Sequence, residues 1–139
     1  MNYFSTPLFL ISLLLTFGIS GCKSANEAEK HADQFYEYLK DQNYESIYEM
    51  LDAEALKESP IELIEGVFEQ KEEYGKLNWF EKKVGFNNKT ANGLTFVTLN
   101  YTCTYDKLTL HERLIFVKRK ESFKIYSYEF NEDETELKN

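Results

Sequence analysis

The chain has 139 residues, of which 24 are acidic and 16 are basic, and its formal net charge is −8 at pH 7. Nucleic acids and anionic lipid surfaces are recognised by Lys and Arg, so this acidic balance argues against both as partners. The length suits one domain, and no internal repeat or interdomain linker divides the sequence.

The N-terminus has the pattern of a secretory signal. Residues 1–21 contain no Asp, Glu, Lys or Arg, and an apolar run extends from Pro7 to Phe17. This run is shorter than the roughly 20 residues that a membrane-spanning helix requires, and a polar chain follows it closely. We therefore expect residues 1–21 to direct export and to be removed.

The segment Ile19-Ser20-Gly21-Cys22 resembles the lipobox of bacterial lipoproteins. The resemblance implies that the signal peptidase recognises the first three residues, cuts before Cys22 and leaves lipid on its thiol. Residues 1–6 depart from the family pattern, because they contain no Lys or Arg. The alternatives are a signal cut nearby, with Cys22 an ordinary residue, or a buried N-terminal helix.

Lipidation of Cys22 would hold the protein to a membrane of the bacterial envelope. Lys23 is not the aspartate that resembles an inner-membrane retention signal, so the outer membrane is favoured where a bacterium has two. An acylated Cys22 also leaves Cys103 without a disulfide partner. We expect a single domain over residues 22–130 and an acidic, solvated tail over residues 131–139.

The first half of the exported part has helical patterns. Ser24 and Glu27 form a capping-box pattern that predicts a helix from there to about Lys40. A short second helix is predicted over Tyr44–Leu51. Apolar residues at three- and four-residue steps form the inner face of the first helix: Ala25, Ala28, Ala32, Phe35 and Leu39.

A third helix is predicted between Ser59 and Gly75. Ser59 would cap it, Pro60 suits its first turn, and Gly75 can take the left-handed position that ends a helix. Gly66 interrupts the pattern, which we interpret as a place of close packing. The side chains that keep helical spacing are Ile61, Ile64, Val67, Phe68, Lys71 and Tyr74.

After Gly75 the period falls to two residues, which predicts strands. The polar stretch over residues 87–93 is expected to be a turn. Val97, Leu99, Tyr101, Cys103 and Tyr105 alternate with polar residues and should share one buried face. The expected strands are Leu77–Phe86, Leu94–Tyr105, Leu108–Lys118 and Phe123–Phe130.

The predicted fold class is α+β, with three N-terminal helices packed on a curved, four-stranded antiparallel sheet. This order resembles the cystatin-like cone of nuclear transport factor two-like proteins, and especially the small bacterial lipoproteins of that group. The resemblance implies a fold and no particular functional residue. It rests on the segment over residues 43–48, the long paired strands, and Ala32, Phe35, Tyr36, Leu39, Tyr74 and Gly75.

Few residue patterns indicate chemistry. His31 and His111 are far apart and expected to be solvated, so no zinc-type spacing exists. Cys103 lies within a predicted strand, where a buried small hydrophobe is favoured over a nucleophile. Gly-rich phosphate loops and nucleophile elbows are absent from the sequence. We expect no metal and no cofactor.

Glu112 is the exception, because it falls on the inward face of its predicted strand between Leu110 and Leu114. An unpaired buried carboxylate is costly, so this position indicates a polar anchor or general base in a pocket. The alternatives are a β-bulge that turns Glu112 outward, or a salt bridge to Lys82 or Lys83. Three aromatic residues would line the pocket, namely Tyr101, Tyr105 and Trp79.

Three functions remain open at this point. The favoured hypothesis is a membrane-tethered, non-enzymatic binding or interaction lipoprotein, whose ligand or partner protein is unknown. The second is a small-molecule enzyme with Glu112 as general base. The third is an envelope inhibitor or immunity lipoprotein.

Overall fold

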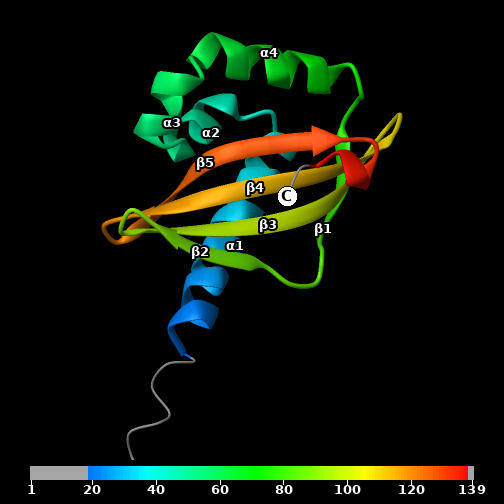
Figure 1. The fold of residues 1–139 in the computed structure, drawn as a ribbon. Helices are drawn as coiled ribbons and strands as arrows, with labels where there is room; N and C mark the ends of the chain where they lie inside the picture. The colour runs from blue at the N-terminus through cyan, green and yellow to red at the C-terminus, as the bar shows by residue number, and fades with distance from the viewer. Residues whose placement is uncertain (1–18, 138–139) are drawn as a thin grey trace, which may run out of the picture.

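The computed structural model describes residues 19–137, apart from the side chains of residues 19–21 and 135. The chain forms an α+β fold in which helices pack on an antiparallel sheet, as predicted (Figure 1). The described part has four α-helices and five strands, one more of each than expected. The helices are α1 (Ile19–Lys40), α2 (Tyr44–Met50), α3 (Ala53–Glu58) and α4 (Ile61–Glu72), and the strands are β1 (Leu77–Lys82), β2 (Asn87–Ala91), β3 (Leu94–Tyr105), β4 (Thr109–Arg119) and β5 (Ser122–Asn131).

The first helix, α1, begins at Ile19 and runs unbroken to Lys40. The prediction that it begins at Ser24 is wrong, because Ser24 lies inside the helix and cannot act as its N-cap. Proline, the strongest helix breaker, is absent from the segment between Ile19 and Ser24, so the helix extends back through it. The predicted apolar face is confirmed by the burial of Ala25, Ala28, Ala32, Phe35 and Leu39.

The loop after α2 contains a helix that was not predicted, α3. It begins after Asp52, whose carboxylate accepts hydrogen bonds from the backbone amides of Glu54 and Ala55. None of the side chains of α3 is fully buried, so the apolar periodicity that marks a packed helix is missing.

The last helix, α4, falls within the predicted third helix. Pro60 is its N-cap residue and makes no side-chain cap, so the prediction that Ser59 caps it is wrong. Gly75 has a φ of +87°, which confirms its left-handed position. The prediction of close packing at Gly66 is wrong, because a Cβ built there would meet nothing within 4 Å.

One edge of the sheet is shared by β1 and β2. Both pair with β3, β1 along Tyr101–Tyr105 and β2 along residues 94–98, so residues 83–86 interrupt a single edge. The prediction of one strand to Phe86 followed by a turn is therefore wrong. The actual turn is at Asn92 and Gly93, whose φ values of 50° and 75° suit a tight hairpin.

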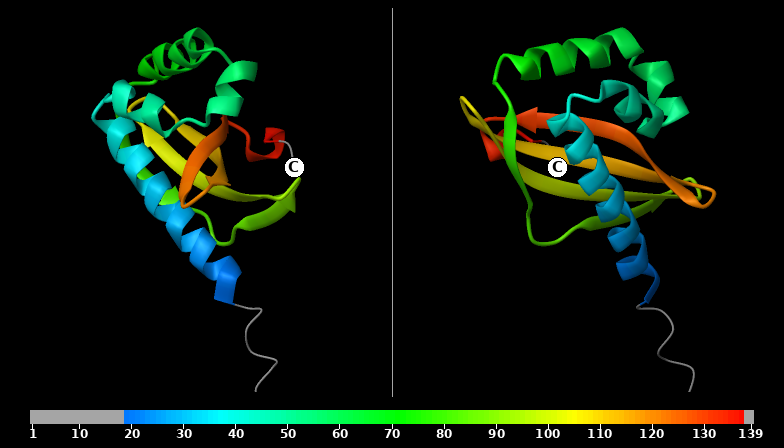
Figure 2. Two further views of the ribbon diagram at one scale, coloured as in Figure 1. Left: turned by 90° about the vertical axis from the view of Figure 1, so that its left-hand side faces the viewer. Right: turned by 180° about the vertical axis from the view of Figure 1, so that it is seen from behind.

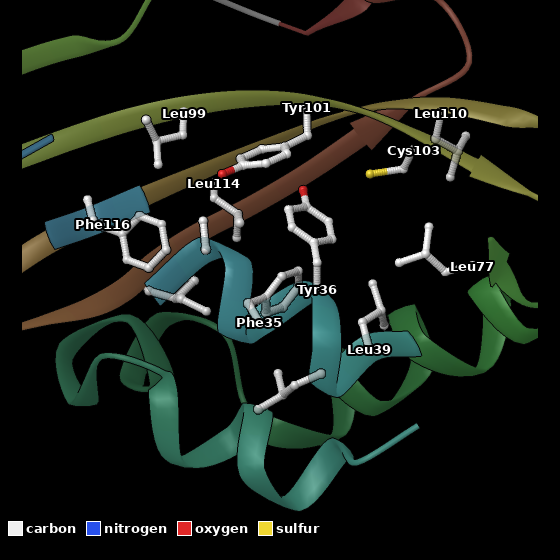
Figure 3. Packing of buried hydrophobic residues seen from close by; sticks show 14 of the residues in the cluster. Phe35, Tyr36, Leu39, Leu77, Leu99, Tyr101, Cys103, Leu110, Leu114 and Phe116 are labelled. Atoms are coloured by element: carbon white, nitrogen blue, oxygen red, sulfur yellow. The ribbon is translucent and has the colours of Figure 1, made fainter. Parts of the chain in front are cut away.

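The remaining strands form the predicted meander, in the order β3, β4, β5. The alternation along β3 is confirmed, since its inward residues from Val97 to Tyr105 are all buried. α1 crosses one face of this sheet, and α2, α3 and α4 lie along the side of β5 (Figure 2). Figure 3 shows the core between these layers, where Phe35, Tyr36 and Leu39 face the side chains of β3 and β4.

The C-terminal segment, expected to be a solvated tail, forms a 3-10 turn at Glu134–Glu136. It contacts the outer face of the sheet, because Lys83 forms an ion pair with Glu134 and Arg113 donates a hydrogen bond of 3.3 Å to the carbonyl of Leu137. The side chains of Glu134 and Glu136 remain exposed. Among residues 19–137, none of the helices has both the length and the apolarity to cross a bilayer.

Candidate functional site

Glu112 lies in the middle of β4, opposite Tyr101 on β3 and Phe130 on β5. Its side chain is 0% exposed and faces inward, as the alternation predicts. The β-bulge considered as an alternative does not turn it outward, because the register shift between β4 and β5 falls later, between Ile115 and Phe116. A carboxylate therefore occupies the core of the sheet.

Both carboxylate oxygens of Glu112 have partners. Oε1 accepts a hydrogen bond of 2.8 Å from the Tyr105 hydroxyl and lies 2.5 Å from the Lys71 ammonium. Oε2 accepts a hydrogen bond of 2.8 Å from the Tyr128 hydroxyl. These partners come from β3, α4 and β5, so Glu112 joins a helix to three strands. We call these four residues and Phe130 the Glu112 cluster.

Lys71 enters this cluster from α4 and is 2% exposed. Its Nζ lies over three aromatic rings, 4.7 Å from the centre of Tyr105, 5.1 Å from Tyr128 and 4.5 Å from Phe130. The negative faces of aromatic rings attract a cation most strongly when water is excluded. The ammonium thus replaces its lost hydration with one carboxylate and three rings.

Burial sets the acid–base properties of the cluster. Burial lowers the pKa of Lys71, and the nearby charge of Glu112 opposes that shift. The pKa values of the Tyr105 and Tyr128 hydroxyls rise, first because they are buried and then because Glu112 is negative. Both hydroxyls therefore remain protonated at neutral pH and serve as donors to Glu112.

Of the four pocket residues predicted from the sequence, three lie in this region, namely Glu112, Tyr101 and Tyr105. Tyr105 bonds Glu112, and Tyr101 is buried opposite it, with its ring centre 4.5 Å from that of Tyr36. Trp79 does not join them, because it is 65% exposed on the edge strand β1. The residues proposed to form a pocket are thus split between the core and the surface.

The partner of Glu112 is neither Lys82 nor Lys83, the two lysines weighed from the sequence. Lys82 Nζ lies 3.0 Å from Glu29 on α1, and Lys83 pairs with Glu134. The true partner, Lys71, occupies the apolar stripe of its helix, three residues after the buried Phe68. A lysine on a buried stripe was the signal that could have identified it.

The two cysteines differ in access. Cys22 is exposed near the start of α1, whereas Cys103 is buried on β3 among the core residues. Burial, followed by the charge of Glu112, raises the pKa of the Cys103 thiol. A thiol with a raised pKa is a poor nucleophile, so this position suits packing.

The two histidines, predicted to be solvated, are only partly so: His31 lies on α1 and His111 on β4, which runs between β3 and β5. His31 is half-buried, with its ring centre 6.5 Å from those of Phe116 and Phe123. His111 is also half-buried, and its Nδ1 atom is buried without a hydrogen-bond partner among the described residues. Within residues 19–137, His, Cys, Asp and Glu side chains form no group that could hold a metal ion.

An apolar cleft of about 200 Å³ lies between the α3–α4 segment and β5. Tyr128 connects it to the Glu112 cluster, since its ring lines the cleft and its hydroxyl bonds Glu112. Ser59 and Ser127 supply polar groups in the lining. The apolar side chains that line the cleft include Leu51, Leu56, Leu63, Val67 and Ile125.

A second hollow, of about 400 Å³, lies on the outer face of the sheet beside the C-terminal turn. Its lining is polar and includes His111, Arg113 and Lys83. Arg113 is held in place by a hydrogen bond of 3.1 Å from its Nε to Asn100. Ion pairs with Glu134 and Glu129 offset the positive charge of the hollow.

Comparison of the chain with known protein families, with characterised proteins and with solved structures gives no match.

Proposed function

We propose that this chain is the precursor of a non-enzymatic binding lipoprotein, tethered to a membrane of the bacterial envelope. The observation that carries the proposal is the exposed Cys22 at the end of the lipobox-like segment. α1 extends out of the domain at this end, so an enzyme or a bilayer can reach the thiol (Figure 1). The other thiol, Cys103, is buried and inaccessible.

The proposed membrane and the proposed domain boundaries also depend on Cys22. Residues 1–21 act as the signal, residues 22–130 form the domain and residues 131–139 form its acidic end. Lys23 after the cysteine favours the outer membrane in a bacterium that has two. The α+β arrangement supports a cystatin-like cone as the finer description of the fold, with the interrupted edge of β1 and β2 as a departure from it.

The binding role rests on the cleft between α3–α4 and β5. Apolar walls with a few polar groups are typical of small-molecule sites. Its volume of about 200 Å³ suits a small apolar ligand or one end of a larger ligand. Ser59 and Ser127 would orient polar atoms of such a ligand.

A catalytic role for Glu112 has less support. A general base must reach a substrate proton, and Glu112 is 0% exposed with both oxygens already accepting hydrogen bonds. Its ion pair with Lys71 instead fixes α4, which forms one wall of the cleft. We assign Glu112 to positioning the binding site.

Labelling with radioactive palmitate in a bacterial host tests the anchor. The label should appear in the full chain and disappear from the Cys22→Ala variant, because only an acylated thiol retains it. Cys103→Ala is the matched control and should keep the label. Labelling that survives Cys22→Ala would overturn the proposal.

Binding of an uncharged naphthylamine dye tests the cleft. The dye should become fluorescent with the native protein and bind poorly to Val67→Glu, which places a charge in the lining. Val84→Glu is the matched control, because Val84 is fully exposed away from the cleft. Equal loss of dye binding in both variants, or none in either, would argue against the cleft as the site.

A further inference from the structure

The link between β1 and β2 presents two apolar side chains to solvent. Val84 is fully exposed and Phe86 is 44% exposed. Gly85 between them has a φ of +94°, and a Cβ built there would meet nothing within 4 Å, so open space surrounds the link at Gly85. Single exposed apolar residues are common on protein surfaces, but two at a projecting tip indicate an interaction site.

This link lies at the end of the molecule that carries Cys22. Lys82, directly before the link, pairs with Glu29 on α1. Cys22 is about two helical turns, or roughly 10 Å, before Glu29 along the helix axis. In all three views the link points toward the same end as the start of α1 (Figures 1 and 2).

The charges around the link favour a neutral lipid surface. Lys82 and Lys83 precede the apolar tip, but both are paired with acidic residues, Glu29 and Glu134. Because the chain as a whole carries a net charge of −8, attraction to anionic lipid is weak. An apolar tip of this kind inserts among zwitterionic headgroups by burying apolar area.

We propose that Val84 and Phe86 insert into the interface of the bilayer to which Cys22 is anchored. The inference rests on the proposed function, because the lipid on Cys22 brings the link to the membrane. Two points of attachment then fix the orientation of the domain. The link and the start of α1 face the bilayer, while α3 and α4, whose residues line the cleft, lie at the opposite end (Figure 2).

Site-specific tryptophan fluorescence tests the insertion. The chain from Cys22 contains the whole described core, which extends from Ala25 to Ile125. This protein is coupled through Cys22 to a maleimide lipid in phosphatidylcholine vesicles, while Cys103 stays buried and uncoupled. Trp79→Phe removes the single tryptophan, and Phe86→Trp then places a reporter in the link.

The emission of Phe86→Trp should move to shorter wavelength on vesicles and be quenched by lipids brominated near the headgroup. Ile61→Trp is the matched control, because Ile61 is 38% exposed on α4 at the far end and does not line the cleft, and its emission should not change. Val84→Trp provides a second reporter in the link. Solvent-like emission from both link reporters would overturn the proposal.

The outcomes separate insertion from the proposed function, because the maleimide lipid replaces the biological anchor. Quenching without palmitate labelling in cells would support insertion and overturn the lipoprotein assignment. Palmitate labelling without quenching would support the lipoprotein assignment and overturn insertion of the link. A spectral shift that needs no vesicles and grows with protein concentration would assign the link to contact with a second copy of the chain, and would also overturn the proposal.

Discussion

At the scale of single residues, the pair formed by Lys71 and Glu112 connects α4 to the sheet. Both side chains are buried, and their hydrogen bonds and ring contacts reach α4, β3 and β5. Taking two charges out of water is costly, so such a pair is stable only while each charge keeps its partner. Loss of one member therefore has a larger effect than loss of both.

Lys71→Met should lower the free energy of unfolding by about 3–5 kcal/mol, because it leaves the Glu112 carboxylate buried without a counter-charge. The double variant Lys71→Met/Glu112→Gln should recover part of that loss, since the glutamine side chain is uncharged and keeps one oxygen that can accept from one of the two tyrosines. Urea unfolding of the domain measures both values.

The exposed ion pair between Lys57 and Glu54 supplies the control for this experiment. Lys57→Met should change the free energy of unfolding by less than about 1 kcal/mol, since exposed pairs contribute little. If the double variant at Lys71 and Glu112 lost as much stability as the sum of its single variants, the two side chains would not be coupled.

The contact between Asp52 and Arg119 predicts that the stability of the domain depends on pH. The hydrogen bonds that Asp52 accepts from the Arg119 guanidinium, at 2.8 and 2.9 Å, hold the pKa of its carboxyl below the usual value, although burial opposes them. A carboxyl whose pKa is lower in the folded state stabilises it above the unfolded pKa of roughly 3.9. This contribution is lost as the pH falls through the folded-state pKa.

Asp52→Asn should therefore be less stable than the native protein at pH 7, and the difference should shrink as the pH falls below about 4. Thermal unfolding over a pH series checks this. Asp41→Asn, at an exposed position, is the control and should follow the native curve throughout. A difference that stayed constant with pH would mean that the ion pair is not responsible.

At the scale of elements, hydrophobic periodicity predicted the strands and helices that bury one apolar face. β3 and β4 were identified almost to the residue, because each alternates apolar and polar side chains around a buried face. β2 was missed because its sequence is polar and its pairing with β3 depends on backbone hydrogen bonds. α3 was missed for a related reason, since it has no buried side chain.

The glycines of the α4 region give a paired prediction. Gly66→Ala should raise the free energy of unfolding by about 0.5–1 kcal/mol, because the position is helical and open space surrounds it. Gly75→Ala should lower it by more than about 1 kcal/mol, because the φ is positive and a Cβ would lie 2.6 Å from Asp106. Chemical denaturation compares them, and equal effects of the same sign would contradict the assignment.

The Glu112 cluster could be predicted from the sequence only in part. The strand alternation placed Glu112, Tyr101 and Tyr105 on one face, because all three lie in strands with a clear period. The contact with Lys71 joins residues 41 positions apart and depends on how α4 crosses the sheet. Local patterns carry no information on that crossing, and the position of Lys71 on the apolar stripe of its helix was the one signal for this partner that the sequence offered.

At the scale of the whole molecule, the domain is held together without a disulfide among its described residues. Cys103 lies in the core and Cys22 is exposed near the start of α1, so the two thiols are not bonded. Addition of a reductant should therefore leave the midpoint of thermal unfolding unchanged, measured by circular dichroism. A lower midpoint under reducing conditions would reveal a bond between the two cysteines.

For a chain that is exported as we propose, the continuity of α1 through Ile19–Lys40 determines when Cys22 can be modified. α1 buries its apolar face against strands that come later in the chain, so it has nothing to pack on while the N-terminus leads the way out. In proteins, most of the stability of a helix comes from the packing of its apolar face. Under the proposed function, a processing enzyme that needs an extended chain would meet residues 19–22 before α1 has packed, so modification of Cys22 would precede folding of the domain.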